Sequence, residues 1–132
     1  MTNKVDNFLH EDLSYKIRGA CFSVHNDLGG GHKEALYQRA LAIELEKLGI
    51  GFEKEKTLPV LYKGVNIGVY RPDFVVNKEI IIELKAVDIM PKTFEVQLTN
   101  YLKSTGLSLG FLINFGPKKV EVRRRINITN QS

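Results

Sequence analysis

The sequence predicts a single α/β domain built around a central mixed sheet of four to five strands flanked by helices. Apolar residues recur at helical spacing before residue 50 and again after residue 91, which indicates two N-terminal helices and a third helix later in the chain. Alternating apolar residues between residues 52 and 73 and after residue 106 indicate a β-hairpin and two closing strands. Between these segments lies the run Ile80-Ile81-Ile82, which is typical of a strand buried on both faces.

The composition is that of an ordinary globular protein with a modest excess of positive charge. Hydrophobic residues make up 43% and charged residues 26% of the 132 residues, and the net charge of +4 is compatible with a polyanionic partner. We expect one domain over residues 11–128 after a flexible segment at residues 1–10. Cys21 is the single cysteine and suits a reducing compartment, and no stretch resembles a signal peptide or a membrane span. These features predict a cytoplasmic protein without a membrane segment.

The two N-terminal helices are expected at about residues 11–27 and 33–48, with a glycine loop at residues 29–31 between them. The first helix carries a stripe that includes Cys21, which we interpret as a core residue and not as a nucleophile. The expected buried face of the second helix consists of Leu36, Ala40, Ile43 and Leu48, widened by Tyr37 and Leu41.

A hairpin is expected after the second helix. Its first strand covers residues 52–62, either as one long strand or with a break at Pro59, its turn is Lys63-Gly64, and its return strand runs on to Asp73. Pro72 has no N–H to donate, which predicts a bulge or an unpaired edge directly beside the Asp73 carboxylate.

The rest of the chain contributes a third helix and two strands. The helix is expected at residues 92–105 and ends at Gly106, and it is followed by a buried strand that ends at Phe115. The last strand begins at Val120 and ends in the run Arg123-Arg124-Arg125. Two interpretations of this run stay open, a solvated group of charges and a contact with a phosphate backbone.

Acidic residues around the triple-isoleucine strand indicate a site of chemistry. Glu83 and Lys85 share one face of that strand, and pairing about the turn at Asn77-Lys78 would bring Asp73 beside Glu83. Two carboxylates so close repel by about 4 kcal/mol at an effective dielectric constant near 20, and a hard divalent cation offsets this best. A structural ion pair of Lys85 with one of the acids is the alternative.

Two short motifs carry a resemblance to known proteins. Pro72-Asp73 followed by Glu83-Leu84-Lys85 resembles the PD-(D/E)xK phosphodiesterase superfamily, and the pattern Gly-x-x-Glu-x-x-Tyr at residues 31–37 is similar to its GxxExxY branch. This resemblance implies a restriction-endonuclease-like core with Mg²⁺ or Mn²⁺ as cofactor. It implies metal ligation by Glu34, Asp73, Glu83 and the Leu84 carbonyl, and a catalytic role for these three acids together with Lys85.

The resemblance extends to residues that would contact the substrate. The pattern Gln97-x-x-x-Tyr101 in the third helix resembles a motif of recombination-type exonucleases, where it braces the site and touches a phosphate of the substrate. Tyr37 and Arg71 are assigned to the substrate as well. For Gln97 and Tyr101 the alternative is a surface amide and a core aromatic.

The resulting expectation is a metal-dependent nuclease that hydrolyses DNA or RNA. Three alternatives stay open: a non-catalytic nucleic-acid-binding module, a protein-interaction module that forms a homodimer through the apolar hairpin edge, and a hydrolase of small phosphoesters. Preference for polymers and a steep loss of affinity with salt would distinguish a nuclease from the last of these.

Overall fold

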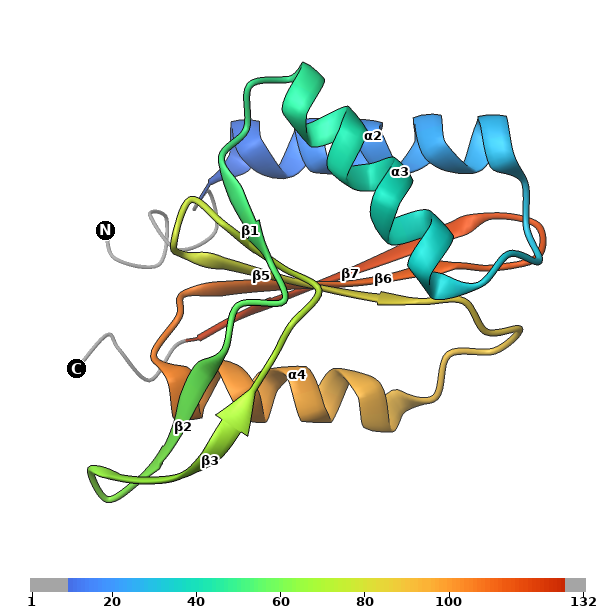
Figure 1. Cartoon of the computed structure of the whole chain (residues 1–132). Coiled ribbons are helices and arrows are strands. Elements are labelled where there is room, and N and C mark those ends of the chain that lie inside the picture. The colour runs from blue at the N-terminus through green and yellow to red at the C-terminus, as the bar shows by residue number, and fades with distance from the viewer. Residues whose placement is uncertain (1–9, 128–132) are drawn as a thin grey trace.

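A computed structural model describes residues 10–127 and shows helices on both sides of a central sheet (Figure 1). The helices are α2 (Glu11–Leu28), α3 (Glu34–Lys47) and α4 (Lys92–Thr105). The strands are β1 (Phe52–Lys54), β2 (Leu58–Tyr62), β3 (Val65–Tyr70), β4 (Phe74–Val76), β5 (Ile80–Lys85), β6 (Leu109–Phe115) and β7 (Val120–Ile126). Each predicted helix is present, and α4 has the predicted bounds.

The central sheet has five strands in the order β1-β4-β5-β6-β7. The pair β5–β6 is parallel and the other neighbours are antiparallel, so the sheet is mixed. Helices α2 and α3 cover one face and α4 covers the other (Figure 1). The predicted fold class is confirmed, and β5, which carries the acidic motif, lies in the middle of the sheet.

Burial follows from this arrangement. All seven residues of β6 are buried, and Ile80, Ile81 and Ile82 of β5 are fully buried, as expected for central strands between two helical layers. Ile80 and Ile82 face the core beneath α2 and α3, whereas Ile81 faces the core beneath α4. By alternation, Glu83 and Lys85 also lie on the α4 side of the sheet.

The segments β1–β2 and β3–β4 together form one long hairpin with a bend. Lys54 pairs with Phe74, and four residues further along Leu58 pairs with Tyr70, so the register is unbroken across the bend. The inner half belongs to the central sheet, and the outer half, β2 and β3, projects beside α4 (Figure 1). A predicted hairpin of this extent is therefore confirmed.

The position of the bend corrects two details of the prediction. The first strand is interrupted at residues 55–57 and not at Pro59, which lies inside β2, and the return strand ends at Tyr70 before resuming at Phe74. Glu55 adopts a left-handed φ of 52° at the bend and donates its N–H to the Asp73 carbonyl, whereas Pro72 has no N–H to continue the ladder. The predicted interruption beside Asp73 is present.

The buried face of α3 differs in part from the predicted one. Tyr37 and Leu41 are buried as predicted, together with Ala42 and Leu45, whereas Leu36, Ile43 and Leu48 are exposed. The stripe of residues 37, 41 and 45 follows the four-residue spacing of a helix face, and it is this stripe that turns toward the sheet. In α2 the predicted core position of Cys21 is confirmed.

Two expectations concern the ends of the chain and membranes. Apart from His10, the segment predicted to be flexible lies outside the described residues. Within residues 10–127, none of the helices combines the length and the apolar character that crossing a bilayer requires.

Candidate active site

Asp73 and Glu83 meet where the long hairpin leaves the sheet. Since β4 pairs Phe74 with Ile82, the next pair along is Asp73 with Glu83, and the Asp73 N–H donates to Glu83 Oε1 at 3.2 Å. The Leu84 N–H in turn donates to Asp73 Oδ2 at 2.7 Å. The predicted proximity of the two acids is confirmed, and the carboxylate of Asp73 stands where a strand partner of Leu84 would be.

The Leu84 carbonyl is directed toward the same place. In a β-strand the N–H and C=O of one residue point to the same neighbour. Because the Leu84 N–H is bound by Asp73, its C=O also points away from β6 and toward Asp73. The interruption of β4 at Asp73 leaves this carbonyl without a strand partner on that side, so it adds an oxygen to the group.

Glu34 approaches from the other side, as the first residue of α3. It is exposed, and its pKa is raised by partial burial and by the charge of Asp73, while Lys85 acts in the opposite direction. Glu34 therefore interacts electrostatically with both Asp73 and Lys85. In the part of the chain that the structure describes, no three His, Cys, Asp or Glu side chains are already gathered as a closed metal-binding cluster.

The position of Glu34 depends on Tyr37, one helical turn later. The Tyr37 hydroxyl donates to the Gly29 carbonyl at 2.6 Å, and its ring stacks on Phe115 with centroids 4.4 Å apart. The loop also approaches the β6–β7 turn so closely that a Cβ on Gly30 would lie 2.6 Å from the backbone of Pro117. These contacts fix the start of α3 against the sheet.

Gln38 is a member of the site that the sequence analysis missed. Its amide donates to Asp73 Oδ1 at 3.1 Å, so both oxygens of Asp73 accept hydrogen bonds. Gln38 follows Glu34 by four residues and therefore shares its helix face. This four-residue spacing from Glu34 is the feature of the sequence from which Gln38 could have been identified.

The acids are more difficult to ionise than usual. Burial is the main cause that raises the pKa of Glu83 to about 7, followed by the charge of Asp73. Burial also raises the pKa of Asp73, although the Leu84 N–H and Lys85 oppose this. Glu34 is shifted in the same direction. Ionising all three places more negative charge here than one lysine balances.

Lys85 is the cation of the group. Its ammonium lies over the ring of Phe94 in α4, with Nζ 4.6 Å from the centroid. A cation held over an aromatic face is attracted by the ring quadrupole, which helps to hold the ammonium in this position. Lys85 lowers the pKa of Glu34, Asp73 and Glu83.

Tyr70 is a second residue that the sequence analysis missed. It is 6% exposed, and its ring stacks on Tyr101 with centroids 3.7 Å apart. Among the described residues its buried hydroxyl has no hydrogen bond of good geometry. It nevertheless lies close to Glu83, whose charge raises the pKa of Tyr70, while Tyr70 lowers the pKa of Glu83. No motif includes Tyr70, and only the hairpin register places it here.

The four residues that were predicted to contact the substrate differ in their exposure to solvent. Arg71 and Gln97 are exposed, and Tyr101 is partly exposed beside Tyr70. Tyr37 is fully buried, so its assignment as a substrate contact is wrong. Its hydroxyl and ring are both occupied by the contacts that hold the glycine loop, and this structural role explains its place one turn after Glu34.

The arginine run is not a group of solvated charges. Arg123 and Arg125 both pair with Glu95 of α4, which is 7% exposed, and Arg123 also pairs with Glu121 at 3.3 Å. These contacts tie the edge strand β7 to α4. Two of the three arginines are thus engaged within the chain, which corrects the expectation of a solvated run.

Comparisons with known proteins agree with this geometry. A family model described as "PD-(D/E)XK nuclease superfamily" matches residues 11–126. The crystal structure of the protein SSO0001 is similar to this chain, with 21% sequence identity and a TM-score of 0.55, and the match covers 70% of this chain and 48% of that one. The chain thus spans about half of that protein's length, and at this identity the likeness concerns the fold. No curated protein matches the chain.

Proposed function

The chain belongs to the PD-(D/E)XK nuclease superfamily, and from this premise we propose that it hydrolyses phosphodiester bonds of DNA or RNA with Mg²⁺ or Mn²⁺ as cofactor. One observation carries the proposal: the Asp73 carboxylate takes the place of a strand beside Leu84, next to Glu83 and Lys85. We also propose that the chain belongs to the GxxExxY branch of this superfamily, because Gly31, Glu34 and Tyr37 match its pattern.

The donor atoms fit a hard cation. They are carboxylate oxygens and one backbone carbonyl, which are the ligands that Mg²⁺ and Mn²⁺ prefer. Asp73, Glu83 and the Leu84 carbonyl would hold the ion, with Glu34 completing the set from the α3 side. The raised pKa values of the three acids support this, because a cation would remove the repulsion that contributes to them.

When bound, the cation would polarise the scissile phosphate and make a bound water more acidic. Groups of the protein stabilise the developing charge and orient the Asp73 carboxylate. Lys85, held over Phe94, stabilises the negative charge that builds on the phosphate oxygens in the transition state. Gln38 and the Leu84 N–H keep the Asp73 carboxylate in one orientation. Water adds to phosphorus, the ester P–O bond breaks, and the leaving oxygen takes up a proton.

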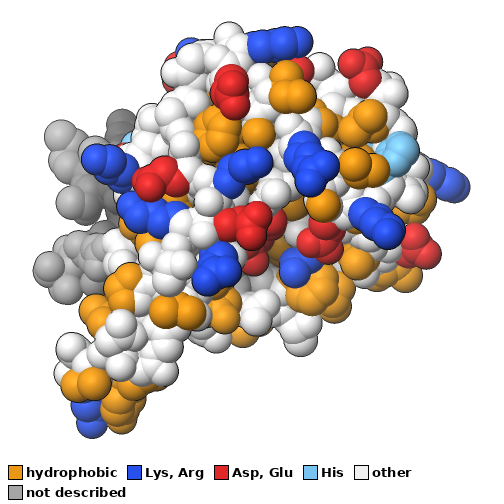
Figure 2. Space-filling model, in the orientation of Figure 1, with side chains coloured by type: hydrophobic (Ala, Val, Ile, Leu, Met, Phe, Trp, Pro, Cys, Tyr) orange, Lys and Arg blue, Asp and Glu red, His pale blue; other side chains and the backbone are white. Residues whose placement is uncertain are grey.

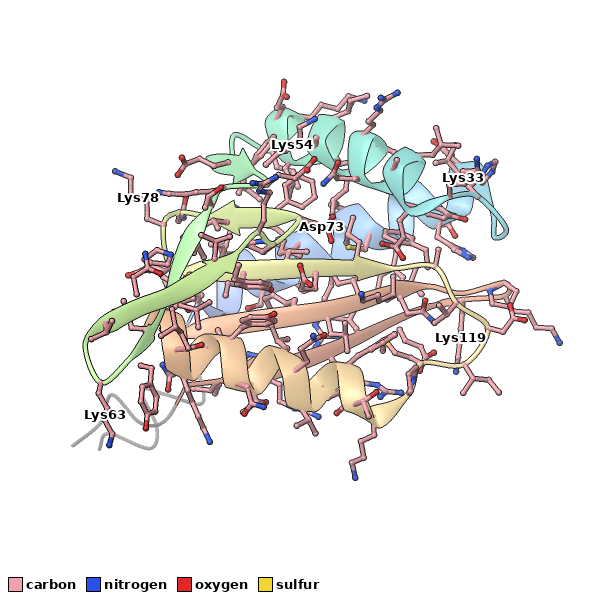
Figure 3. The ribbon with its side chains drawn as sticks, turned by 60° about the horizontal axis from the view of Figure 1, so that its bottom comes forward. Lys33, Lys54, Lys63, Asp73, Lys78 and Lys119 are labelled. Carbon is pink, nitrogen blue, oxygen red and sulfur yellow. The ribbon has the colours of Figure 1, made fainter. Side chains whose placement is uncertain are left out.

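Substrate contacts are proposed for exposed residues around these acids. Arg71 and Gln97 are exposed, and Tyr101 stacks on Tyr70. In Figure 3, Lys54 lies above Asp73, with Lys33 and Lys78 toward opposite ends of the molecule. Acidic side chains near the middle of the face in Figure 2 have basic ones around them, which is an arrangement suited to holding a phosphate backbone next to a cation site.

The test is cleavage of labelled single- and double-stranded DNA and RNA with Mg²⁺, with Mn²⁺ and with EDTA. We expect metal-dependent cleavage that D73A and K85A both abolish, whereas E46A, which removes an exposed carboxylate of α3, leaves it unchanged. Calorimetric titration with Mn²⁺ separates binding from chemistry. A wild-type protein that binds nucleic acid but cuts no substrate would favour the non-catalytic alternative.

A further inference from the structure

The outer half of the long hairpin, residues 58–70, presents an apolar surface to solvent; we call this segment the arm. Val65, Ile67 and Val69 of β3 are all exposed, and Leu61 and Tyr62 add exposed apolar surface near the turn. The pairing of β2 with β3 shifts register between Val60 and Leu61, so this apolar surface extends around the end of the arm. These five side chains are 47% to 65% exposed. Figure 2 shows the arm as a mainly hydrophobic projection with a basic group at its end.

The arm is anchored, so its exposure does not come from a detached segment. Tyr70 is part of the core beneath α4, and Leu58 and Val60 pack against that core from the inner face. The register of the arm continues that of β1 and β4 in the central sheet. An apolar face that remains exposed on an anchored ribbon is typical of an interaction surface.

The charge of the arm indicates the chemistry of its partner. Between Thr57 and Tyr70 the only charged residue is Lys63, which lies at the outer turn, away from Asp73 (Figure 3). A surface that binds a phosphate backbone needs several cations, whereas this one matches an apolar protein surface. In addition, among residues 10–127 β2 and β3 pair with each other alone, so within this range neither outer edge has the strand partner or the row of charges that prevents association.

We propose that the exposed apolar surface of the arm binds the same surface of a second copy of this chain, around a two-fold axis. An apolar face is self-complementary, and a two-fold dimer uses the same patch on both copies. The exposed fractions of these five side chains amount to roughly a few hundred Å² of apolar surface per copy, which is the size of a patch that marks an interaction site. Pairing of two such surfaces would bury about 1,000 Å² or less, which is at the low end for specific interfaces and predicts a weak, concentration-dependent dimer.

The dimer would lie close to the candidate active site. Val69 precedes Asp73 by four residues, which is at most about 14 Å of extended chain. The two copies would therefore bring their sites to neighbouring positions. The dimer itself does not depend on the proposed nuclease activity.

Analytical ultracentrifugation of the full chain from about 1 to about 500 µM tests the proposal. We expect a monomer–dimer equilibrium in which I67K weakens association about tenfold or more, because it buries a charge in the interface. I43K is the matched control, since Ile43 is 55% exposed on α3, and it should associate like the wild type. Circular dichroism shows that each variant is folded.

A cross-link gives a second test that does not depend on the lysine variants. Cys21 is fully buried, so I67C adds the single accessible thiol among the described residues. Under mild oxidation we expect a disulfide-linked dimer for I67C and not for I43C. A wild type that stays monomeric over the whole range, or a dimer that survives I67K and is dissociated by I43K, would overturn the proposal.

Discussion

Two groups of acidic residues in the molecule differ in how their charge is balanced. Glu95 is 7% exposed and pairs with both Arg123 and Arg125. At the bend of the hairpin, three acids with raised pKa values share Lys85. The first group is satisfied within the chain and stabilises a strand edge. In the second group three acids share one lysine, and we propose that this excess of negative charge distinguishes a site that attracts a cation from a structural ion pair.

The largest expected effect is on catalysis. D73N keeps the shape of the side chain but removes its charge, so we expect it to lower metal-dependent cleavage by about a thousandfold or more and to abolish detectable Mn²⁺ binding. Cleavage rates and calorimetric titration measure the two effects. E46A serves as the exposed control. If D73N cleaved at the wild-type rate, the acids at the bend would have a structural role, as Glu95 has, and not a catalytic one.

The second prediction concerns Glu95. E95A removes the buried acid that pairs with the partly exposed Arg123 and Arg125, so we expect the free energy of unfolding to fall by about 1 to 3 kcal/mol, as measured by urea denaturation. The rate of cleavage per folded molecule should stay unchanged, because Glu95 contacts none of the acids at the bend. E121A removes only the more exposed partner of Arg123 and should cost much less. Loss of cleavage in folded E95A would remove the distinction between the two groups.

The third prediction uses pH. The pKa of Glu83 in the folded protein is about 7 against 4.5 for an unperturbed glutamate, so the folded state holds the proton more tightly. Metal-free protein should therefore lose stability as the pH rises through this window, by on the order of 1 to 3 kcal/mol after allowance for partial exposure. E83Q should not show this pH-dependent loss of stability, because its side chain does not ionise. Thermal unfolding in EDTA at about pH 5 and about pH 8 measures it, and added Mn²⁺ should restore wild-type stability at the higher pH. Identical pH profiles for the two proteins would contradict the shift.

The charge balance also explains how much of the molecule could be predicted from its sequence. Periodicity located the helices, and the turn at Asn77-Lys78 was enough to place Asp73 beside Glu83. Gln38 and Tyr70 were missed because their roles depend on which face of α3 meets the sheet and on the hairpin register. The arginine run was misinterpreted because its partner, Glu95, is 28 residues from Arg123 and no local pattern links them. Local sequence patterns determine the helices and strands, whereas the contact partners of side chains depend on how these elements pack in the folded chain.

The smallest expected effect tests whether Tyr70 belongs to the acidic group. Its buried hydroxyl either lacks any partner or donates to Glu83, and Y70F keeps the stacking on Tyr101 while removing only that oxygen. An unpaired buried hydroxyl costs stability, so Y70F would then stabilise the protein. If the hydroxyl supports the Glu83 carboxylate, as the lower pKa that it confers indicates, Y70F should weaken Mn²⁺ binding by about 1 kcal/mol, which is roughly fivefold.

Y101F is the matched control for this experiment, because it removes a hydroxyl from the other ring of the same stacked pair. We expect Y101F to bind Mn²⁺ like the wild type, since no pKa interaction links Tyr101 with Glu83 directly. The sign of the stability change and the Mn²⁺ affinity together decide the outcome. A more stable Y70F with unchanged Mn²⁺ affinity would assign Tyr70 to the core beneath α4, whereas weaker binding without unfolding assigns it to the positioning of Glu83.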